Sequence, residues 1–266
     1  MRVAMTLFVR DEADIIDPLL RYHLHVGVDV FVVMDNGSTD GTTEILQSYE
    51  TEGHVRLIRE PRDVSQEDSV TTLARLAAVE HHADWVINSD ADEFWWPREG
   101  SLKDMLGLVP AEHGVLHAPW WHFPPRPGDG WFPDRMTVRL CEPQPPRWHQ
   151  GVKAAHRGDP NVIVAGGNHG AKLTSGTVHT RPLLDVLHYP YRSSEQFERK
   201  FIRWCSLLVH VDRLPPRYQE AWDAYQRGRL DWLYRSYLVS DRQLRRGTRR
   251  GIYVIDERVR DALATL

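Results

Sequence analysis

The first 88 residues alternate between short apolar runs and helical patterns, and this alternation limits the possible folds more than any other feature. The run at 28–34 is apolar and β-branched almost throughout, which is typical of a parallel strand buried on both faces. Strands are predicted at 2–9, 28–34, 54–59 and 85–88, and helices at about 15–27, 42–49 and 65–82. Three successive strand–helix units predict right-handed crossovers and a parallel sheet with helices on its faces.

The composition of the sequence changes after residue 95. Nine of the 17 prolines lie between Pro110 and Pro146, which indicates a loop-rich region. Short strands are predicted at 115–121, 137–140 and 162–165, an apolar run covers 183–187, and helices are expected at 193–211 and over much of 216–247. Because no internal repeat or low-complexity linker interrupts the chain, we expect a single α/β domain over 1–266. Its Rossmann-like, mostly parallel half would cover 1–100, and a mixed, partly helical half would cover 101–266.

Composition places this chain among ordinary globular proteins, with 41% apolar and 26% charged residues. Its apolar runs are far shorter than the roughly 20 residues that a membrane-spanning helix needs. The two cysteines, Cys141 and Cys205, form no Cys-x-x-Cys pair, which favours reduced thiols. We therefore expect a cytoplasmic protein without a membrane span.

Charge is distributed unevenly along the sequence. Residues 1–198 carry 18 basic and 29 acidic side chains, whereas residues 199–266 carry 15 basic and 8 acidic ones. The basic C-terminal part could attract a phosphorylated substrate, a membrane surface or nucleic acid. It could equally be a solvated helical face.

Carboxylates follow two of the predicted strands. Asp35 ends the second strand and precedes the turn Gly37-Ser38-Thr39-Asp40-Gly41, where it could accept a bond from a base or ribose, or simply cap the helix that follows. Asp90 and Asp92 follow the fourth strand and could converge on one hard divalent cation that carries phosphate oxygens. Ligands of open parallel sheets bind at the carboxyl ends of the strands, so both places are candidate parts of a site.

Three segments together resemble the family 2-like glycosyltransferases of the GT-A fold, in the subgroup with an Asp-x-Asp-Glu-Phe motif. They read RDEADIIDPLLRYHLHVGVDVFVVMDNGSTDGTTEIL, WVINSDADEFWWP and LHYPYRSSEQFERKF. The resemblance implies a hexosyltransferase-type enzyme that uses Mn²⁺ or Mg²⁺ and a nucleoside-diphosphate sugar, with UDP as the expected nucleotide. The acceptor could be a glycan, a peptide or a small natural product, and no nucleic-acid partner is implied.

The resemblance also assigns expected roles to individual residues. Thr6, Phe8 and Arg10 would lie along the nucleotide, and Asp35 would hold the base. Asp90 and Asp92 would bind ribose, metal and diphosphate. His188 is expected at the metal, because neutral imidazole suits Mn²⁺. Arg192 and Ser193, at the start of a predicted helix, could contact the diphosphate.

An inverting reaction also needs a base that takes the proton of the acceptor hydroxyl. The candidates for this base are Asp134, His169, Glu93 and His122. Sugar or aglycone rings could stack on flat aromatic faces, for which the candidates are Trp95, Trp96, Trp120, Trp121 and Trp131.

Two other functions remain open at this level. A nucleotidyltransferase also combines a parallel sheet with metal-binding acids, although the turn after the first strand, Arg10-Asp11-Glu12, lacks the usual Gly-rich basic pattern. A non-catalytic sugar- or nucleotide-binding module is the other alternative.

Overall fold

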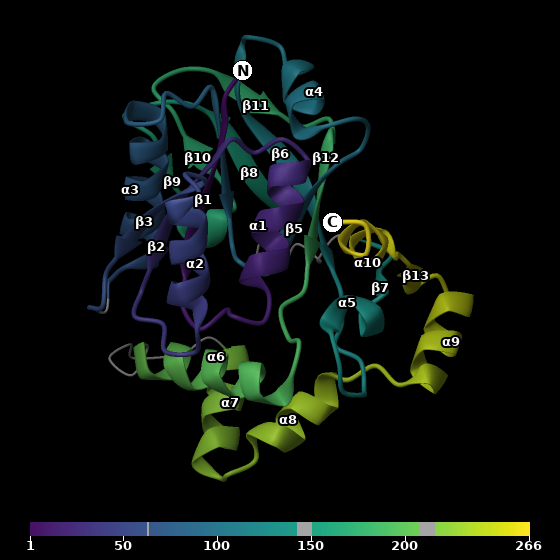
Figure 1. Cartoon of the computed structure of the whole chain (residues 1–266). Coiled ribbons are helices and arrows are strands. Elements are labelled where there is room, and N and C mark those ends of the chain that lie inside the picture. The colour runs from purple at the N-terminus through teal and green to yellow at the C-terminus, as the bar shows by residue number, and fades with distance from the viewer. Residues whose placement is uncertain (63, 143–150, 208–215) are drawn as a thin grey trace. The chain divides into compact units, whose positions relative to one another are not determined.

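The parallel core expected from the sequence is present in the computed structural model of the chain (Figure 1). The structure describes residues 1–62, 64–142, 151–207 and 216–266. These residues divide into two compact units that are not consecutive halves. Unit 1 comprises 1–121, 142–188 and 261–266, and unit 2 comprises 122–141 and 189–260. The single domain over 1–266 stays a prediction.

Unit 1 is built on a nine-stranded sheet in the order β3-β2-β1-β4-β8-β6-β12-β5, with β11 paired to β6. The first four strands in chain order are β1 (Val3–Val9), β2 (Val30–Asp35), β3 (Val55–Arg59) and β4 (Trp85–Ser89). They pair in parallel, with β1 at the centre between β2 and β4. The predicted α/β class, with a Rossmann-like parallel sheet and a mixed later part, is therefore confirmed.

Burial explains why these four segments form strands. Every residue of β2 and β4 is buried, so both faces of the sheet are covered here. Apolar side chains on one face of β1, β2 and β4 form a core cluster with helix α3 (Gln66–Val79), in which Leu73, Ala74 and Ala77 have no exposed surface. The side chain of Ser65 accepts a bond from the Asp68 amide at the start of α3, as its position in the sequence predicts. Helices α1 (Ile16–His25) and α2 (Thr42–Thr51) lie in front of the sheet in the view of Figure 1.

The later strands of unit 1 pair mainly in antiparallel fashion, in contrast to the first four. They are β5 (Glu93–Pro97), β6 (His113–His122), β8 (Val152–Arg157), β9 (Ile163–Val164), β10 (Ala171–Lys172), β11 (Thr177–His179) and β12 (Leu184–His188). Strand β8 lies between β4 and β6 and is antiparallel to both, and β12 is antiparallel to β5. The short helices α4 (Leu102–Gly107) and η1 (Gly166–Asn168) complete this part.

Unit 2 is mostly helical and has its own apolar cluster. Its elements are α5 (Phe132–Arg135), β7 (Val138–Leu140), α6 (Ser194–Leu207), α7 (Pro216–Gln226), α8 (Leu230–Tyr237), α9 (Asp241–Arg249) and β13 (Tyr253–Ile255); α10 (Arg258–Leu263) runs on into the last residues of unit 1. Phe197 on α6, Ala221 on α7 and Leu233 on α8 are buried against one another. Strands β7 and β13 form a separate antiparallel pair. The last four residues of the helix predicted at 193–211 lie outside the described residues. Across the described ranges, none of the helices is both long and apolar enough to cross a bilayer.

Candidate active site

The candidate site lies where β4 ends and the chain turns directly into β5. Only Asp90, Ala91 and Asp92 separate the two strands, so Glu93 is already the first residue of β5. In the antiparallel register of β5 with β12, Glu93 is the partner of His188. This register brings the predicted histidine next to the predicted acidic motif.

Three of these side chains form a compact set of ligand atoms. Asp92, Glu93 and His188 are buried, and one ligand atom of each lies within 4.8 Å of the other two. His188 Nε2 is 3.5 Å from Asp92 Oδ1. Two carboxylates and one imidazole are a donor set that suits Mn²⁺ and also accepts Mg²⁺ through the oxygens. The residues present thus fit the divalent cation that the resemblance implies.

Asp90 instead accepts hydrogen bonds from two protein groups. Lys153 Nζ lies 2.7 Å from Asp90 Oδ2, and Asn168 Nδ2 lies 3.1 Å from Asp90 Oδ1. The role of Asp90 as a ligand for metal or nucleotide stays a prediction.

Lys153 is one of two residues at this site that the sequence analysis missed; the other is Asn168. Its side chain is 1% exposed, and Nζ also lies 2.7 Å from Glu93 Oε1 and from the Gly167 carbonyl. Burial would by itself lower the pKa of Lys153, but Asp90 and Glu93 raise it above the ordinary lysine value, so the ammonium stays charged. The buried acids therefore have a counterion supplied by β8.

Glu93 has no exposed surface, and its surroundings shift the pKa of its carboxyl strongly. Burial raises the pKa of its carboxyl well above the ordinary value, and Asp90 and Asp92 add to the rise, while Lys153 opposes it. Its second oxygen accepts a bond from the Asp90 amide at 3.1 Å. A perturbed carboxyl of this kind, beside other acids at a strand end, is typical of a functional site.

The segment 166–169 closes one side of the acidic cluster. Asn168 is fully buried and adopts a left-handed backbone conformation (φ 62°), which asparagine tolerates better than most residues. The neighbouring His169 is half-buried, and its Nδ1 lies 2.8 Å from the Val152 carbonyl. This predicted base candidate thus lies beside the strand that carries Lys153.

Trp120 packs against the same cluster. Its ring centroid is 4.3 Å from that of His188 and 5.6 Å from that of His169, and Lys153 Nζ lies 5.2 Å from it. Trp95, in contrast, is fully buried and donates from Nε1 to Ser89 Oγ at 3.1 Å. Of the tryptophans predicted to stack on sugars, Trp120 therefore lies at the site, and Trp95 belongs to the core.

The other three predicted tryptophans differ in their burial. Trp96 stacks on Tyr22 with 5.3 Å between the centroids. Trp121 is half-buried, and Trp131 in unit 2 is 42% exposed.

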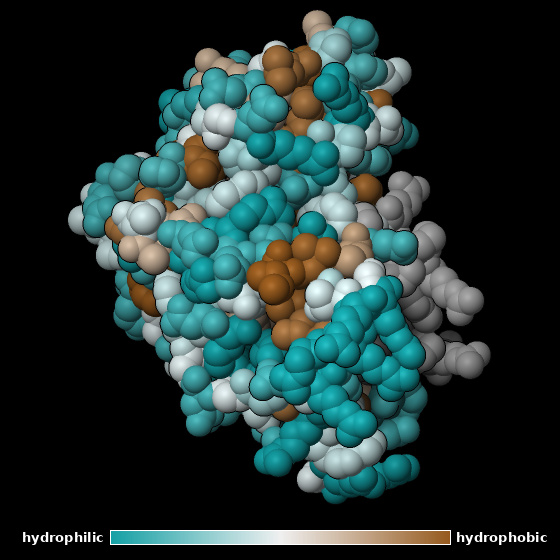
Figure 2. All heavy atoms as spheres, turned by 90° about the vertical axis from the view of Figure 1, so that its right-hand side faces the viewer, coloured by the Kyte–Doolittle hydropathy of each residue, from teal (hydrophilic) through white to brown (hydrophobic). Residues whose placement is uncertain are grey.

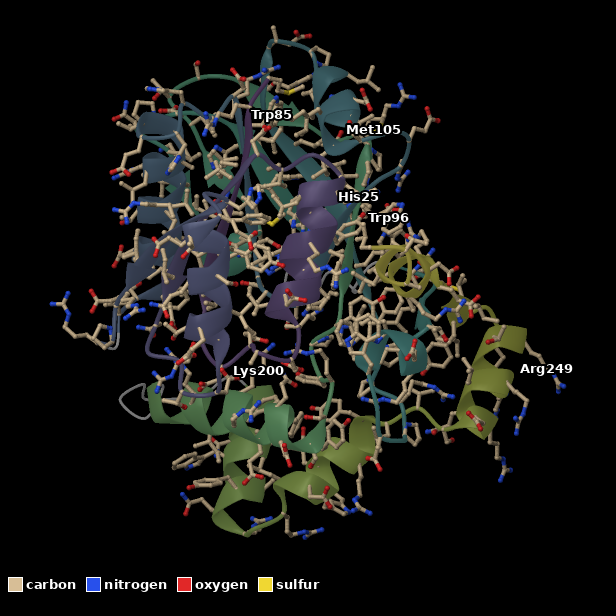
Figure 3. The ribbon with its side chains drawn as sticks, viewed as in Figure 1. His25, Trp85, Trp96, Met105, Lys200 and Arg249 are labelled. Atoms are coloured by element: carbon tan, nitrogen blue, oxygen red, sulfur yellow. The ribbon has the colours of Figure 1, made fainter. Side chains whose placement is uncertain are left out.

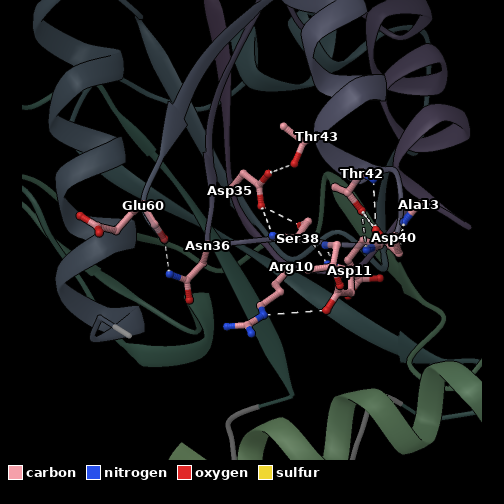
Figure 4. A network of polar contacts seen from close by, with 12 residues as sticks. Arg10, Asp11, Ala13, Asp35, Asn36, Ser38, Asp40, Thr42, Thr43 and Glu60 are labelled. Atoms are coloured by element: carbon pink, nitrogen blue, oxygen red, sulfur yellow. Dashed lines mark hydrogen bonds and ion pairs between the residues drawn. The ribbon is translucent and has the colours of Figure 1, made fainter. Parts of the chain in front are cut away.

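The turn after β2 is a dense polar network in unit 1 (Figure 4). Asp35 is 3% exposed, and its Oδ1 accepts bonds from the Ser38 amide at 2.9 Å and from Ser38 Oγ at 2.6 Å. Thr43 donates to its other oxygen. Asp11 Oδ1 accepts from the Thr39 amide at 2.7 Å, which ties the loop after β1 to this turn. Asp35 thus organises the turn as an Asx cap does, and its contact with a base stays a prediction.

Thr6, Phe8 and Arg10 project from the same face of β1 and its continuation because side chains alternate along a strand. Thr6 Oγ1 donates to Asn88 Oδ1 on β4 at 2.9 Å, with both side chains buried. Phe8 is half-buried against the core cluster, and Arg10 Nε lies 3.8 Å from an Asp11 oxygen. The three residues therefore lead from the sheet towards the turns at its carboxyl edge.

The remaining candidates belong to unit 2. Asp134 is exposed on α5, whereas His122 is half-buried. Arg192 is 2% exposed and its Nη1 donates to the Tyr189 carbonyl at 3.1 Å. Ser193 Oγ accepts from the Gln196 amide at 3.1 Å, so it caps the start of α6.

The family model described as "Glycosyl transferase family 2" matches residues 16–171. The chain belongs to glycosyl transferase family 2. The family resemblance predicted from the sequence is confirmed. The matched part of this family 2 chain contains the acids of the β4–β5 turn, Lys153 and Asn168, but it ends before His188.

One curated relative is the lipopolysaccharide core biosynthesis glycosyltransferase LpsC from Rhizobium meliloti (strain 1021). It is 31% identical over 162 residues, which cover 58% of this chain and 54% of the relative, so this family 2 chain spans about half of that protein's length.

Among solved structures, Staphylococcus aureus TarS 1-349 in complex with UDP-GlcNAc has a TM-score of 0.48 at 14% identity, covering 82% of this chain and 69% of that one. GalNAc-T7 with UDP, GalNAc and Mn²⁺ has a TM-score of 0.46 at 13% identity, covering 71% and 44%. At these TM-scores the structural likeness is weak, and membership of family 2 rests on the family model.

Proposed function

We propose that this family 2 chain transfers a sugar from a nucleoside-diphosphate sugar, with UDP as the nucleotide, to an acceptor hydroxyl, with inversion and with the help of a divalent cation. The observation that carries the proposal is the buried set of Asp92, Glu93 and His188 at the carboxyl end of β4. Ligands of parallel sheets bind at this end of the strands. Sugar transfer by LpsC, as its name states, and the UDP-GlcNAc bound to TarS agree with the same chemistry.

Asp92, Glu93 and His188 would hold Mn²⁺ or Mg²⁺ in this reaction. The cation would stabilise negative charge on the departing nucleoside diphosphate. Lys153 keeps Asp90 and Glu93 in place through two ion pairs, and Asn168 orients the second oxygen of Asp90. Thr6, Phe8, Arg10, Asp35, Asp90, Arg192 and Ser193 are the proposed contacts for the nucleotide and its phosphates.

The base of an inverting transfer must accept a proton from the acceptor hydroxyl. Asp134, His169 and Glu93 are the proposed candidates. Glu93 is completely buried and paired with Lys153, which favours the other two for direct contact with an acceptor. Replacing Asp134 by Asn and His169 by Gln should therefore separate them, since only loss of the base lowers kcat without weakening donor binding.

The proposal also includes the compartment in which the reaction takes place and the class of acceptor. Two cysteines without a framework fit a cytoplasmic reaction. A glycan, a peptide or a small natural product is the proposed acceptor class.

The first test is thermal unfolding with a panel of nucleoside diphosphates, with and without Mn²⁺, for the parent chain, Asp92→Asn and Glu99→Gln. Glu99 is an exposed acid of unit 1 and serves as the matched control. We expect UDP with Mn²⁺ to stabilise the parent and Glu99→Gln by about 2.7 kcal/mol at a hundredfold excess over Kd, and to leave Asp92→Asn unchanged.

The second test identifies the products formed from UDP-sugars and from nucleoside triphosphates with Mn²⁺. Release of UDP from a UDP-sugar, lost in Asp92→Asn, supports a glycosyltransferase. Pyrophosphate released from a triphosphate would indicate a nucleotidyltransferase instead, and binding without any turnover would indicate a binding module.

A further inference from the structure

Helix α9 in unit 2 presents an unusually dense row of arginines. Arg242, Arg245, Arg246 and Arg249 recur at helical spacing and therefore share one face, and Arg250 follows at the end of the helix. All five are exposed, and together they line a hollow of about 450 Å³. Figure 3 shows Arg249 extending away from the ribbon of α9.

These charges are not balanced by nearby acids. Asp241 is the acidic residue of α9, and it pairs with Arg126 rather than with a member of the row. Within the described ranges, none of the five guanidinium groups of the row forms an ion pair. Like charges at this spacing destabilise a helix by a few tenths of a kcal/mol per pair, so folding alone gives no reason for such a row.

Exposed aliphatic side chains adjoin the arginine row. The Ile252 amide donates to the Gly247 carbonyl at 2.9 Å, so the chain turns back against α9 directly after the helix. Tyr253 packs on Gly247, where a Cβ atom would lie 2.3 Å from the tyrosine ring. Next to this contact, Ile252, Val254 and Ile255 are exposed, with exposed fractions of 46%, 37% and 63%. Figure 2 shows a hydrophobic area that borders a strongly hydrophilic one.

We propose that α9 and β13 form a docking surface for an anionic lipid bilayer. Each arginine near such a surface gains attraction from the negative headgroups, and exposed aliphatic side chains gain by entering the boundary between headgroups and acyl chains. The combination favours a bilayer over nucleic acid, because a phosphate backbone attracts arginines but offers no place for Ile252 and Ile255. Helix α9 also carries no aromatic side chain on which bases could stack.

The test is flotation of the full chain with vesicles of 30% phosphatidylglycerol in phosphatidylcholine, compared with vesicles of phosphatidylcholine alone. The charge variant replaces Arg242, Arg245, Arg246 and Arg249 by Gln, and the aliphatic variant combines Ile252→Ser with Ile255→Ser. A control variant replaces three exposed basic residues of unit 1 by Gln, namely Arg59, Lys172 and Arg181. Circular dichroism checks that each variant is folded.

We expect the parent and the control variant to bind only the anionic vesicles, and more weakly as salt rises. The charge variant should lose about fivefold in the vesicle partition coefficient per arginine, several hundredfold in all. The aliphatic variant should also bind more weakly, and this loss should persist at high salt because it is not electrostatic.

Four outcomes would overturn the proposal. They are no binding by the parent, equal binding to both vesicle types, a charge variant that binds like the parent, and an aliphatic variant that binds like the parent. If the last outcome is found and the parent also binds duplex DNA, the row is assigned to nucleic acid. None of these measurements depends on sugar transfer, so failure here and failure of the proposed function are distinguishable.

Discussion

At the scale of single residues, the candidate site depends on the buried ammonium group of Lys153. Lys153 Nζ contacts Asp90, Glu93 and a backbone carbonyl, each at 2.7 Å. A buried ion pair is costly to break, because the group that remains is charged and no longer solvated. Lys153 therefore affects the stability of the whole sheet as well as the shape of the site.

Replacing Lys153 by Met should lower the free energy of unfolding by about 3–5 kcal/mol, since Asp90 and Glu93 lose their partner. Urea denaturation measures this change. The matched control, Lys172→Met at an exposed lysine of β10, should stay within about 0.5 kcal/mol of the parent. Adding Glu93→Gln to Lys153→Met should restore part of the loss, and a double variant no more stable than Lys153→Met would argue against the coupling.

The parts of the site that could be predicted are residues whose side chains commonly bind metal ions. Asp92 was expected from its position after a strand and His188 from the family resemblance, and the structure brings them together. Lys153 and Asn168 were missed, because a lysine within Gly151-Val152-Lys153-Ala154 has the pattern of an ordinary exposed strand residue. Its burial follows from β8 being inserted between β4 and β6, and local sequence carries no signal for that position.

At the scale of elements, His23 links α1 to β5. Its Nδ1 lies 2.8 Å from the Leu19 carbonyl within α1, and its Nε2 accepts a bond from the Trp95 amide at 3.0 Å. Nδ1 must carry a hydrogen to donate to the Leu19 carbonyl, whereas Nε2 must lack one to accept from the Trp95 amide. This arrangement therefore requires the neutral imidazole. Burial lowers the pKa of His23 to about 3.

Acid should therefore destabilise the chain through His23. The folded state keeps the imidazole neutral, while the unfolded chain takes up a proton near pH 6.5, so this contribution to stability is present above that pH and is lost as the pH falls towards 3. Between pH 7.5 and pH 5 the loss should be about 2 kcal/mol.

Urea denaturation of His23→Gln over this pH range isolates the effect. The variant should show a pH dependence flatter by about 2 kcal/mol than that of the parent. His25→Gln, which changes an exposed histidine of the same helix, should keep the parent's dependence. An equal slope in the parent and His23→Gln would mean that His23 is not neutral in the fold.

At the scale of the whole molecule, the chain has more than one apolar core. One described cluster joins α3 to the parallel strands of unit 1, and another joins α6, α7 and α8 in unit 2. Leu233 on α8 is 1% exposed and belongs to the second cluster. Separate cores allow parts of a molecule to open at different free energies.

Leu233→Ala should therefore lower the free energy of unfolding of unit 2 by about 2–5 kcal/mol. Unit 1 should be affected less. Native-state hydrogen exchange should show faster exchange of the amides of α6 and α8, with the amides of β1 and β2 unchanged. Leu108→Ala, at a leucine that is 61% exposed, should change neither set. Equal loss of protection in both units would indicate one cooperative domain.

The order of elements in the first 88 residues followed from the sequence, because buried parallel strands and amphipathic helices have distinct periods. The later strands were harder to predict. Strand β5 begins with the acidic Glu93 and ends with Pro97, and β8 contains Lys153, His156 and Arg157, so neither has the apolar pattern of a strand. Residues distant in the sequence pair with these polar groups. The same pairings bring β8 and β12 into the sheet of the earlier strands, so unit 1 is discontinuous in the sequence.

The division into units also constrains how the chain is made. Residues 261–266 belong to unit 1, although 72 residues of unit 2, from Tyr189 to Arg260, precede them. On the ribosome, β1 to β4 emerge early and can pair, but unit 1 lacks its final segment until all of unit 2 has been translated. Nascent chains stalled at residue 188 would therefore hold the parallel strands of unit 1 without residues 261–266.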